Sequence, residues 1–136
     1  MSTLDFDVEY RYVSTPEGIH IPIRLVLADR AVDLTARLDT GAADCVLDRF
    51  FADVLAIDVE SGVRQVYRTV AGSFVAYGHE MTIRTLGLEW SATVYFYEAT
   101  GRQNSFIGRR GWLDRVRLAL VHYDERIYLA QYDKSP

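Results

Sequence analysis

The sequence contains little cysteine and little proline, and each scarcity excludes a class of protein. Its 136 residues include one cysteine, three prolines and nine glycines. A single cysteine cannot form an internal disulfide, which favours a reducing, cytoplasmic location. The low proline and glycine content is not typical of disordered or collagen-like chains, and 49% of the residues are apolar, as in ordinary globular proteins.

The sequence also lacks a long apolar run and a basic block. The apolar clusters at residues 50–57 and 90–97 are much shorter than the ~20 residues that a membrane helix needs. The acidic segment at residues 1–9 has no apolar core, unlike a signal peptide. The net charge is −4 and both signs are mixed along the chain, whereas nucleic-acid binding needs concentrated Lys and Arg. We therefore expect one domain over residues 1–136, with no membrane span and no nucleic-acid partner.

The most informative feature is the triplet Asp39-Thr40-Gly41, which stands between two apolar segments. The preceding segment, residues 34–38, is suited to a strand, and Gly41 allows the chain to turn sharply. A carboxylate on such a turn is exposed at the end of a rigid strand, where binding and catalytic groups are common. The alternative is an ordinary polar β-turn, in which Asp and Gly are frequent.

The alternation of apolar and polar residues predicts a chain that is mostly β, with short connections. A hairpin with the tip Ala71-Gly72-Ser73 is expected at residues 65–83. Short helices are expected at residues 48–57 and 109–116. The other expected strands cover residues 6–12, 19–27, 31–38, 81–85, 89–97, 117–121 and 126–131. The pattern suits an all-β class and a small, closed, barrel-like fold.

A second motif, Phe106-Ile107-Gly108 followed by Arg109, lies far downstream of the triplet. With Asp-Thr-Gly-Ala at residues 39–42, it gives the chain a pattern that resembles the retropepsin-like aspartic proteases. These are single-domain enzymes of retroviruses, with divergent forms in bacteria. The resemblance covers roughly residues 20–130. It implies a small closed acid-protease-type β barrel with one short C-terminal helix.

The single Asp-Thr-Gly triplet indicates a homodimer. Peptide hydrolysis by carboxylates needs two of them, one that accepts a proton from water and one that donates a proton to the carbonyl. A twofold dimer would supply both from one Asp39 per chain, and the resemblance implies the same. Asp39, Thr40 and Gly41 are then the catalytic residues and a peptide or protein is the substrate. No cofactor and no metal are expected, because the three histidines are scattered.

The hairpin at residues 65–80 matches the position of the flap in these proteases. A flap would let an extended peptide pair as an added strand and would exclude water from the reacting carbonyl. The alternative is an ordinary exposed hairpin. The residues expected to contact substrate are Ala42, Asp44, Val70, Ala71, Gly72, Ser73, Ile107 and Gly108.

Two positions depart from the viral pattern. Ala43 stands where the viral enzymes have an Asp that pairs with the Arg after the apolar-apolar-Gly element. Arg109 therefore lacks that partner, and either Asp44 replaces it or Arg109 points elsewhere. Cys45 stands where the viral enzymes often have Thr. We expect a buried, inert thiol, and the alternative is a redox-sensitive thiol beside the site. Two other functions remain open, a peptide-binding module without catalysis and a domain that only mediates assembly.

Overall fold

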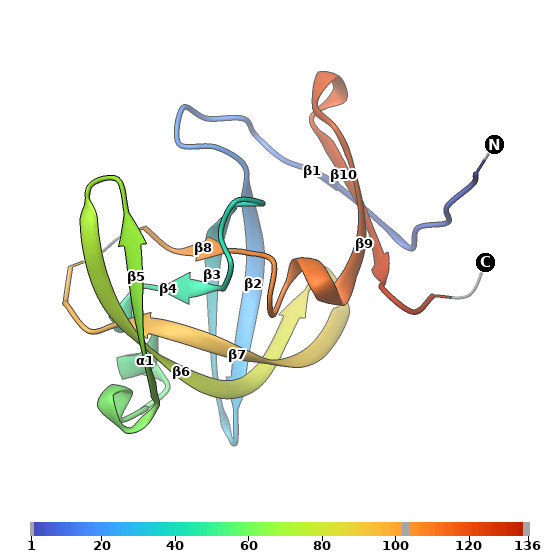
Figure 1. Ribbon diagram of the computed structural model, residues 1–136. Helices are drawn as coiled ribbons and strands as arrows, with labels where there is room; N and C mark the ends of the chain where they lie inside the picture. Colours follow the sequence, from blue (N-terminus) through green and yellow to red (C-terminus); the bar gives the residue numbers. More distant parts are fainter. Residues whose placement is uncertain (1, 102–103, 135–136) are drawn as a thin grey trace.

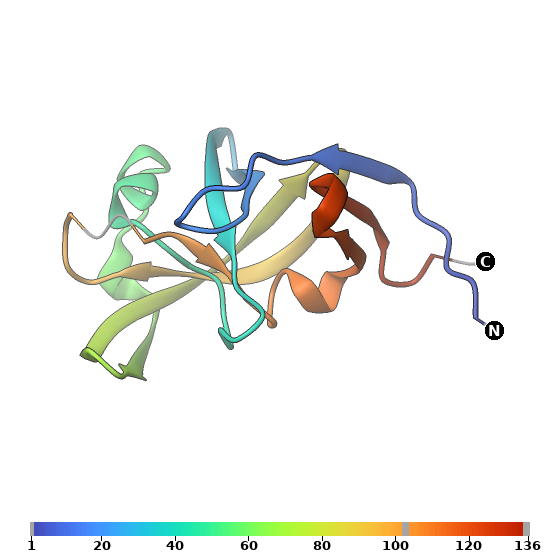
Figure 2. The ribbon, with the colours of Figure 1, turned by 90° about the horizontal axis from the view of Figure 1, so that it is seen from above.

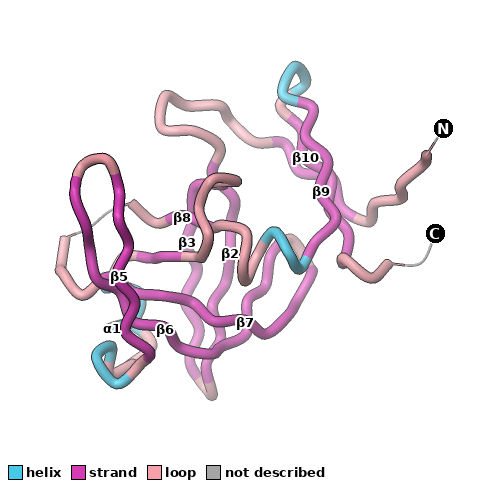
Figure 3. Tube along the Cα trace, viewed as in Figure 1, coloured by secondary structure: helices cyan, strands magenta, loops and turns pink. Residues whose placement is uncertain are grey.

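The computed structural model describes residues 2–101 and 104–134, and these residues are mostly β (Figures 1 and 3). The helical elements are α1 (Arg49–Val54) and three short 3-10 turns, η1 (Val59–Ser61), η2 (Leu113–Arg115) and η3 (His122–Asp124). The strands are β1 (Val8–Arg11), β2 (His20–Leu27), β3 (Arg30–Leu38), β4 (Val46–Leu47), β5 (Val63–Thr69), β6 (Gly72–Thr85), β7 (Leu88–Tyr97), β8 (Phe106–Ile107), β9 (Val116–Val121) and β10 (Arg126–Gln131).

Seven strands form the main sheet in the order β2-β3-β8-β4-β7-β6-β5. β2 also pairs with β6 through Arg24–Val26, so the strand pairings return to their starting point. The view from above shows the sheet curving around its own interior (Figure 2). Fully buried side chains from several of these strands fill that interior, among them Ile21, Leu25, Ile83, Phe96 and Ile107. The prediction of an all-β, barrel-like fold is therefore confirmed.

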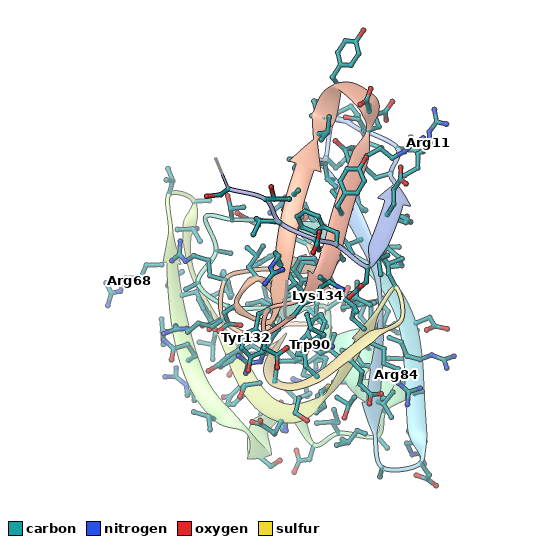
Figure 4. All side chains as sticks on the ribbon, turned by 90° about the vertical axis from the view of Figure 1, so that its right-hand side faces the viewer. Arg11, Arg68, Arg84, Trp90, Tyr132 and Lys134 are labelled. Carbon is teal, nitrogen blue, oxygen red and sulfur yellow. The ribbon has the colours of Figure 1, made fainter. Side chains whose placement is uncertain are left out.

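A second sheet is built from the two ends of the described chain, in the order β1-β10-β9. It stands beside the main sheet, and both chain ends lie on its side of the molecule (Figures 1 and 2). Figure 4 shows this sheet extending away from the main one, with Arg11 toward its outer end. The hairpin of β9 and β10 agrees with the strands expected at residues 117–121 and 126–131.

Two tryptophans fix the segment that follows β8. Trp112 is fully buried, and its indole donates a hydrogen bond to Thr85 Oγ1 at 3.1 Å. Trp90 donates to the carbonyl oxygen of Gly111 at 2.7 Å, and its ring packs edge-on against Trp112. Because buried indole N–H groups need partners, these bonds hold residues 111–112 against β6 and β7.

Two local predictions need correction. The helix expected at residues 109–116 is only the 3-10 turn η2, because Gly111 has a φ of +100° and Trp112 has non-helical angles. The hairpin tip is Val70-Ala71, since Gly72 already pairs with Thr69 and Ser73 with Arg68. The helix expected at residues 48–57 forms as the shorter α1, which Asp48 caps by accepting from the backbone of Phe50. Within residues 2–101 and 104–134, no helix has the length and apolar character to cross a membrane.

Candidate active site

Strand β3 ends immediately before Asp39, and backbone hydrogen bonds hold this end on both sides. The N–H of Leu38 donates to Ile19 at 2.8 Å, and the N–H of Asp39 donates to Ile107 at 3.0 Å. β8 lies parallel to β3 here, with Leu38 opposite Ile107. The position of Asp39 is thus fixed by two neighbouring segments rather than by its own loop.

The Asp-Thr-Gly segment forms a tight turn around the Asp39 carboxylate. The N–H of Gly41 donates to Asp39 Oδ1 at 3.0 Å, and the N–H of Ala42 donates to the Asp39 carbonyl at 3.2 Å. A Cβ on residue 41 would lie only 3.3 Å from Oδ1, so glycine permits this close approach. The carboxylate remains 35% exposed, oriented by one backbone donor and still open to solvent.

The backbone of the loop after Asp39 crosses, in direct contact, the backbone of the segment that follows β8. The N–H groups of Arg109 and Arg110 donate to the carbonyls of Ala42 and Ala43, at 2.9 and 2.8 Å. A Cβ on Gly108 would lie 2.4 Å from the carbonyl oxygen of Asp44, well inside any real contact. Glycine at position 108 is therefore a steric requirement of the crossing.

The ion pair beside this crossing involves Asp44 and Arg110. Arg110 donates from Nε and Nη2 to the two carboxylate oxygens of Asp44, at 2.9 and 3.2 Å. Asp44 therefore does not become the partner of Arg109, and the second alternative, that Arg109 points elsewhere, is the one observed. Arg109 instead donates from Nη1 to the carbonyl of Thr40 at 3.2 Å and reaches that of Gly41 at 3.5 Å.

Tyr67 on β5 connects the hairpin to the same carboxylate. Its hydroxyl donates to Asp44 Oδ2 at 2.8 Å, and its ring stacks on Phe74 with centroids 5.0 Å apart. Burial, the hydrogen bond to Asp44 and the negative charge of Asp44 all raise the pKa of Tyr67. Tyr67 therefore stays a neutral donor, and Asp44, which is only 5% exposed, has three donated bonds.

A cavity of about 680 Å³ lies between the Asp39 turn and the β5–β6 hairpin. Of the residues predicted from the sequence, it is lined by Asp39, Gly41, Ala42, Asp44 and Ala71. The other lining residues are Arg37, Ala43, Tyr67, Arg68, Thr69, Phe74, Tyr97, Asn104, Phe106 and Arg109. The structure thus brings the triplet at residues 39–41 and the hairpin at residues 63–85 to one cavity.

The remaining predicted residues do not line this cavity. Val70 is fully exposed at the hairpin tip, and Ile107 is fully buried behind the turn. Gly108 is packed against backbone, as described above. Thr40 and Gly72 are exposed and Ser73 lines a separate hollow. Substrate contact by these residues stays a prediction, which closure of the hairpin or a second subunit would have to produce.

Sequence reasoning missed two charged residues of the site, Arg37 and Arg110. Arg37 is on β3, two positions before Asp39, and the alternation of side chains along the strand, continued to Asp39, places both side chains on one face. Its Nη2 is 3.5 Å from Asp39 Oδ2. That spacing was readable in the sequence. Arg110 gave no such signal, because only the fold shows which of two consecutive arginines reaches Asp44.

Cys45 is buried, as expected. Its side chain is 1% exposed, and its Sγ lies 3.6 Å from the carbonyl oxygen of Arg110. Burial raises the pKa of the thiol from 9.0 to about 12. The thiol is therefore uncharged at neutral pH and forms part of the packing behind the site.

No protein-family model matches the chain, and no curated protein sequence matches it. Among solved structures, the chain is similar to the crystal structure of a retropepsin-like aspartic protease from Rickettsia conorii. The TM-score is 0.64 at 20% sequence identity, and the match covers 91% of this chain and 99% of that one. At this identity the likeness establishes the fold. The chain has a retropepsin-like fold, as its two motifs predicted.

Proposed function

We propose that this protein is an aspartic endopeptidase that acts as a homodimer, with one Asp39 from each subunit. The observation that carries the proposal is the Asp39 carboxylate, held by Gly41 on a rigid turn and exposed to a large cavity in a retropepsin-like fold. Thr40 and Gly41 shape the turn that presents the carboxylate. The reaction needs no cofactor.

In the proposed mechanism, the two Asp39 carboxyls face each other across the twofold axis and share one proton. The charged carboxylate removes a proton from a water molecule, which attacks the carbonyl carbon of the peptide bond. The protonated carboxyl donates to the carbonyl oxygen. The tetrahedral intermediate then collapses: the carboxyl that took the proton from water gives it to the nitrogen, the other carboxylate takes a proton from a hydroxyl of the intermediate, and the C–N bond breaks.

The dimer is supported by the surface of the smaller sheet and its flanking segments. Large apolar side chains are exposed there, including Val13, Leu120, Val121 and Tyr123. These side chains would leave water if this surface were an interface with a second chain, although Phe50, Val63 and Val70 are exposed on other parts of the molecule. A symmetric dimer would use the same surface of both subunits, and the proposed catalysis requires that this dimer also bring the two Asp39 carboxyls together.

The hairpin of β5 and β6 supports a peptide substrate. In the described part of the chain, β5 is an edge strand that pairs only with β6. The free edge of such a strand can accept an extended peptide through backbone hydrogen bonds. We propose that the hairpin closes over the bound peptide, and that the protein works in the cytoplasm.

One observation favours a second candidate, a peptide-binding module without catalysis. Arg37 lies 3.5 Å from the outer oxygen of Asp39 and partly neutralises its charge. If that contact persisted with peptide bound, Asp39 would anchor the peptide site instead of activating water.

The test that separates the two candidates compares three forms of the protein against a diverse peptide library. Wild type should cleave, and Asp39→Asn should bind peptides but not cleave them, because an amide cannot act as a general base. Asp33→Asn is the matched control, since Asp33 is on β3, the strand that leads into Asp39, and its side chain is 69% exposed. Cleavage by Asp39→Asn at the wild-type rate would reject the proposal, and binding without cleavage by wild type would favour the second candidate.

A further inference from the structure

We propose that the cavity around Asp39 selects peptides with a carboxylate side chain next to the scissile bond, and that Arg37 recognises this carboxylate. The inference rests on the proposed peptidase function and adds a substrate class to it. The inference is drawn from the arginines that line the cavity, because few of them have an acidic partner within the described chain.

Arg37 lines the cavity, and neighbouring segments hold its backbone and the aliphatic part of its side chain. Its backbone is fixed between β2 and β8, because it lies opposite His20 and its N–H donates to the carbonyl of Ser105 at 2.9 Å. Its aliphatic part packs on the turn that contains Gly18, where a Cβ would lie 3.2 Å from Arg37 Cδ. The stem is thus preorganised while the side chain remains 37% exposed. A preorganised guanidinium loses less entropy when it binds a partner.

The cavity lining has an excess of positive charge. Its basic residues are Arg37, Arg68 and Arg109, and its acidic residues are Asp39 and Asp44. The charge of Asp44 is already neutralised by Arg110, which holds both carboxylate oxygens and does not line this cavity. Asp39 is then the one acid of this lining that remains, and Arg37 contacts it at 3.5 Å, so Arg68 and Arg109 have no acidic partner among the described residues. When two Asp39 carboxyls share a proton in a dimer, the negative charge per cavity is smaller still.

The three arginines also keep donors available. Arg37 makes one long contact, to Asp39, and Arg109 reaches backbone carbonyls through Nη1 alone. Arg68, on the hairpin, has no ion pair or hydrogen bond with another described side chain, and Figure 4 shows it pointing outward from the hairpin. A guanidinium with free N–H groups binds a carboxylate through two parallel hydrogen bonds, which a neutral amide cannot match.

The position of Arg37 indicates that the acidic side chain of the peptide binds next to the scissile bond. Arg37 contacts the Asp39 carboxylate, so a group bound by Arg37 lies beside the reacting peptide bond. A twofold dimer would place one Arg37 on each side of that bond. Aromatic rings of Tyr67, Phe74 and Phe106 line the rest of the cavity and suit apolar parts of the peptide.

The test starts from any peptide that wild type cleaves at one site. Matched versions carry Glu, Gln or Lys at each of the two positions that flank the cut. We expect kcat/KM for Glu to exceed that for Gln by about tenfold at one or both positions, as for a charge-assisted bond, and to fall when salt is added. In Arg37→Gln the Glu-to-Gln ratio should approach one, and in Arg37→Glu the preference should shift to Lys.

The ratio within each variant is the readout, so a general loss of activity in an Arg37 variant does not affect the result. Arg24→Gln is the matched control, because Arg24 forms an exposed ion pair with Asp33 outside the cavity, and it should keep the wild-type ratio. A wild-type ratio of one or less at both positions, or an unchanged ratio in Arg37→Gln, would overturn the inference and leave the peptidase proposal intact.

A second measurement tests whether Arg37 recognises the peptide carboxylate even if the protein cleaves no peptide. Fluorescence anisotropy would compare binding of the same labelled peptides to Asp39→Asn, with and without Arg37→Gln. Binding of the Glu peptide about tenfold tighter than the Gln peptide, lost with Arg37→Gln, would support recognition even if wild type cleaved nothing and the peptidase proposal failed. Equal binding of the two peptides would overturn the inference.

Discussion

Tyr67 donates its hydroxyl hydrogen to Asp44 at 2.8 Å, and this bond joins the β5–β6 hairpin to the loop that carries Asp39. Asp44 in turn is held by Arg110 from the segment after β8. Three stretches that are distant in the sequence therefore meet at one buried carboxylate. Because buried charges must be paired, each of the three stretches depends on the other two for its position.

The first prediction concerns this bond. Tyr67→Phe removes one of three donors to a carboxylate that is 5% exposed. We expect the free energy of unfolding in urea to fall by ~1–2 kcal/mol. Tyr123→Phe is the control, since Tyr123 is 97% exposed, and should change stability little. Equal stabilities for the two variants would show that the Tyr67 bond contributes nothing.

The second prediction concerns the mobility of the hairpin. The tip, Val70-Ala71, packs against little, and β5 pairs on one edge only. Amide hydrogens at residues 68–76 should exchange faster than those of β7, which is paired on both sides. A bound peptide should slow that exchange, and Tyr67→Phe should accelerate it in the free protein. Uniform protection with and without peptide would argue against a flap.

The third prediction concerns Gly108. Gly108→Ala places a Cβ 2.4 Å from one carbonyl oxygen and 2.6 Å from another, so the crossing of the two loops must open. We expect loss of several kcal/mol of stability or failure to fold. Gly87→Ala is the control: its φ is +87° and its Cβ would meet nothing within 4 Å, so only backbone strain of ~1 kcal/mol applies. Thermal unfolding of both variants measures the difference.

The fourth prediction uses the raised pKa of Cys45. At pH 8 a thiol of pKa about 12 has roughly a thousandfold less thiolate than one at 9.0, and thiolate is the reactive form. Alkylation of native protein by iodoacetamide should be at least that much slower than in urea. Above pH 9.0 the unfolded thiol ionises first, so raising the pH destabilises the native state. Equal native and unfolded rates would show that Cys45 is accessible.

The sequence predicted the fold because its two motifs correspond to backbone constraints. The turn at Asp-Thr-Gly requires Gly41, and the crossing of the two backbones after β8 requires Gly108. Both requirements are therefore visible in the sequence as short motifs. The helix expected at residues 109–116 does not form because of contacts with a distant part of the chain. Apolar spacing suited a helix, but Arg109 and Arg110 bond to Ala42 and Ala43, and Gly111 turns the chain.

The turn that presents Asp39 could be predicted from the sequence, whereas the pairing of the charged residues around it could not. The turn at Asp39 and Gly41 was predictable because it depends on local backbone chemistry, and the structure contains that turn; the catalytic role of these residues stays a prediction. The partner of Asp44 was not predictable, since choosing Arg110 over Arg109 depends on how two loops align in space. The positive charge of the cavity also emerged only from the fold, because its arginines come from three separate segments.

The central claim is that each active site contains one Asp39 from each of two subunits. Mixing a fixed amount of wild type with increasing Asp39→Asn, under conditions of subunit exchange, tests it most directly. If heterodimers are inactive, peptide cleavage falls in proportion to the wild-type fraction and is halved at an equimolar mixture. Cleavage that stays constant as Asp39→Asn is added, while mass spectrometry detects heterodimers, would contradict the claim, because one Asp39 would then suffice.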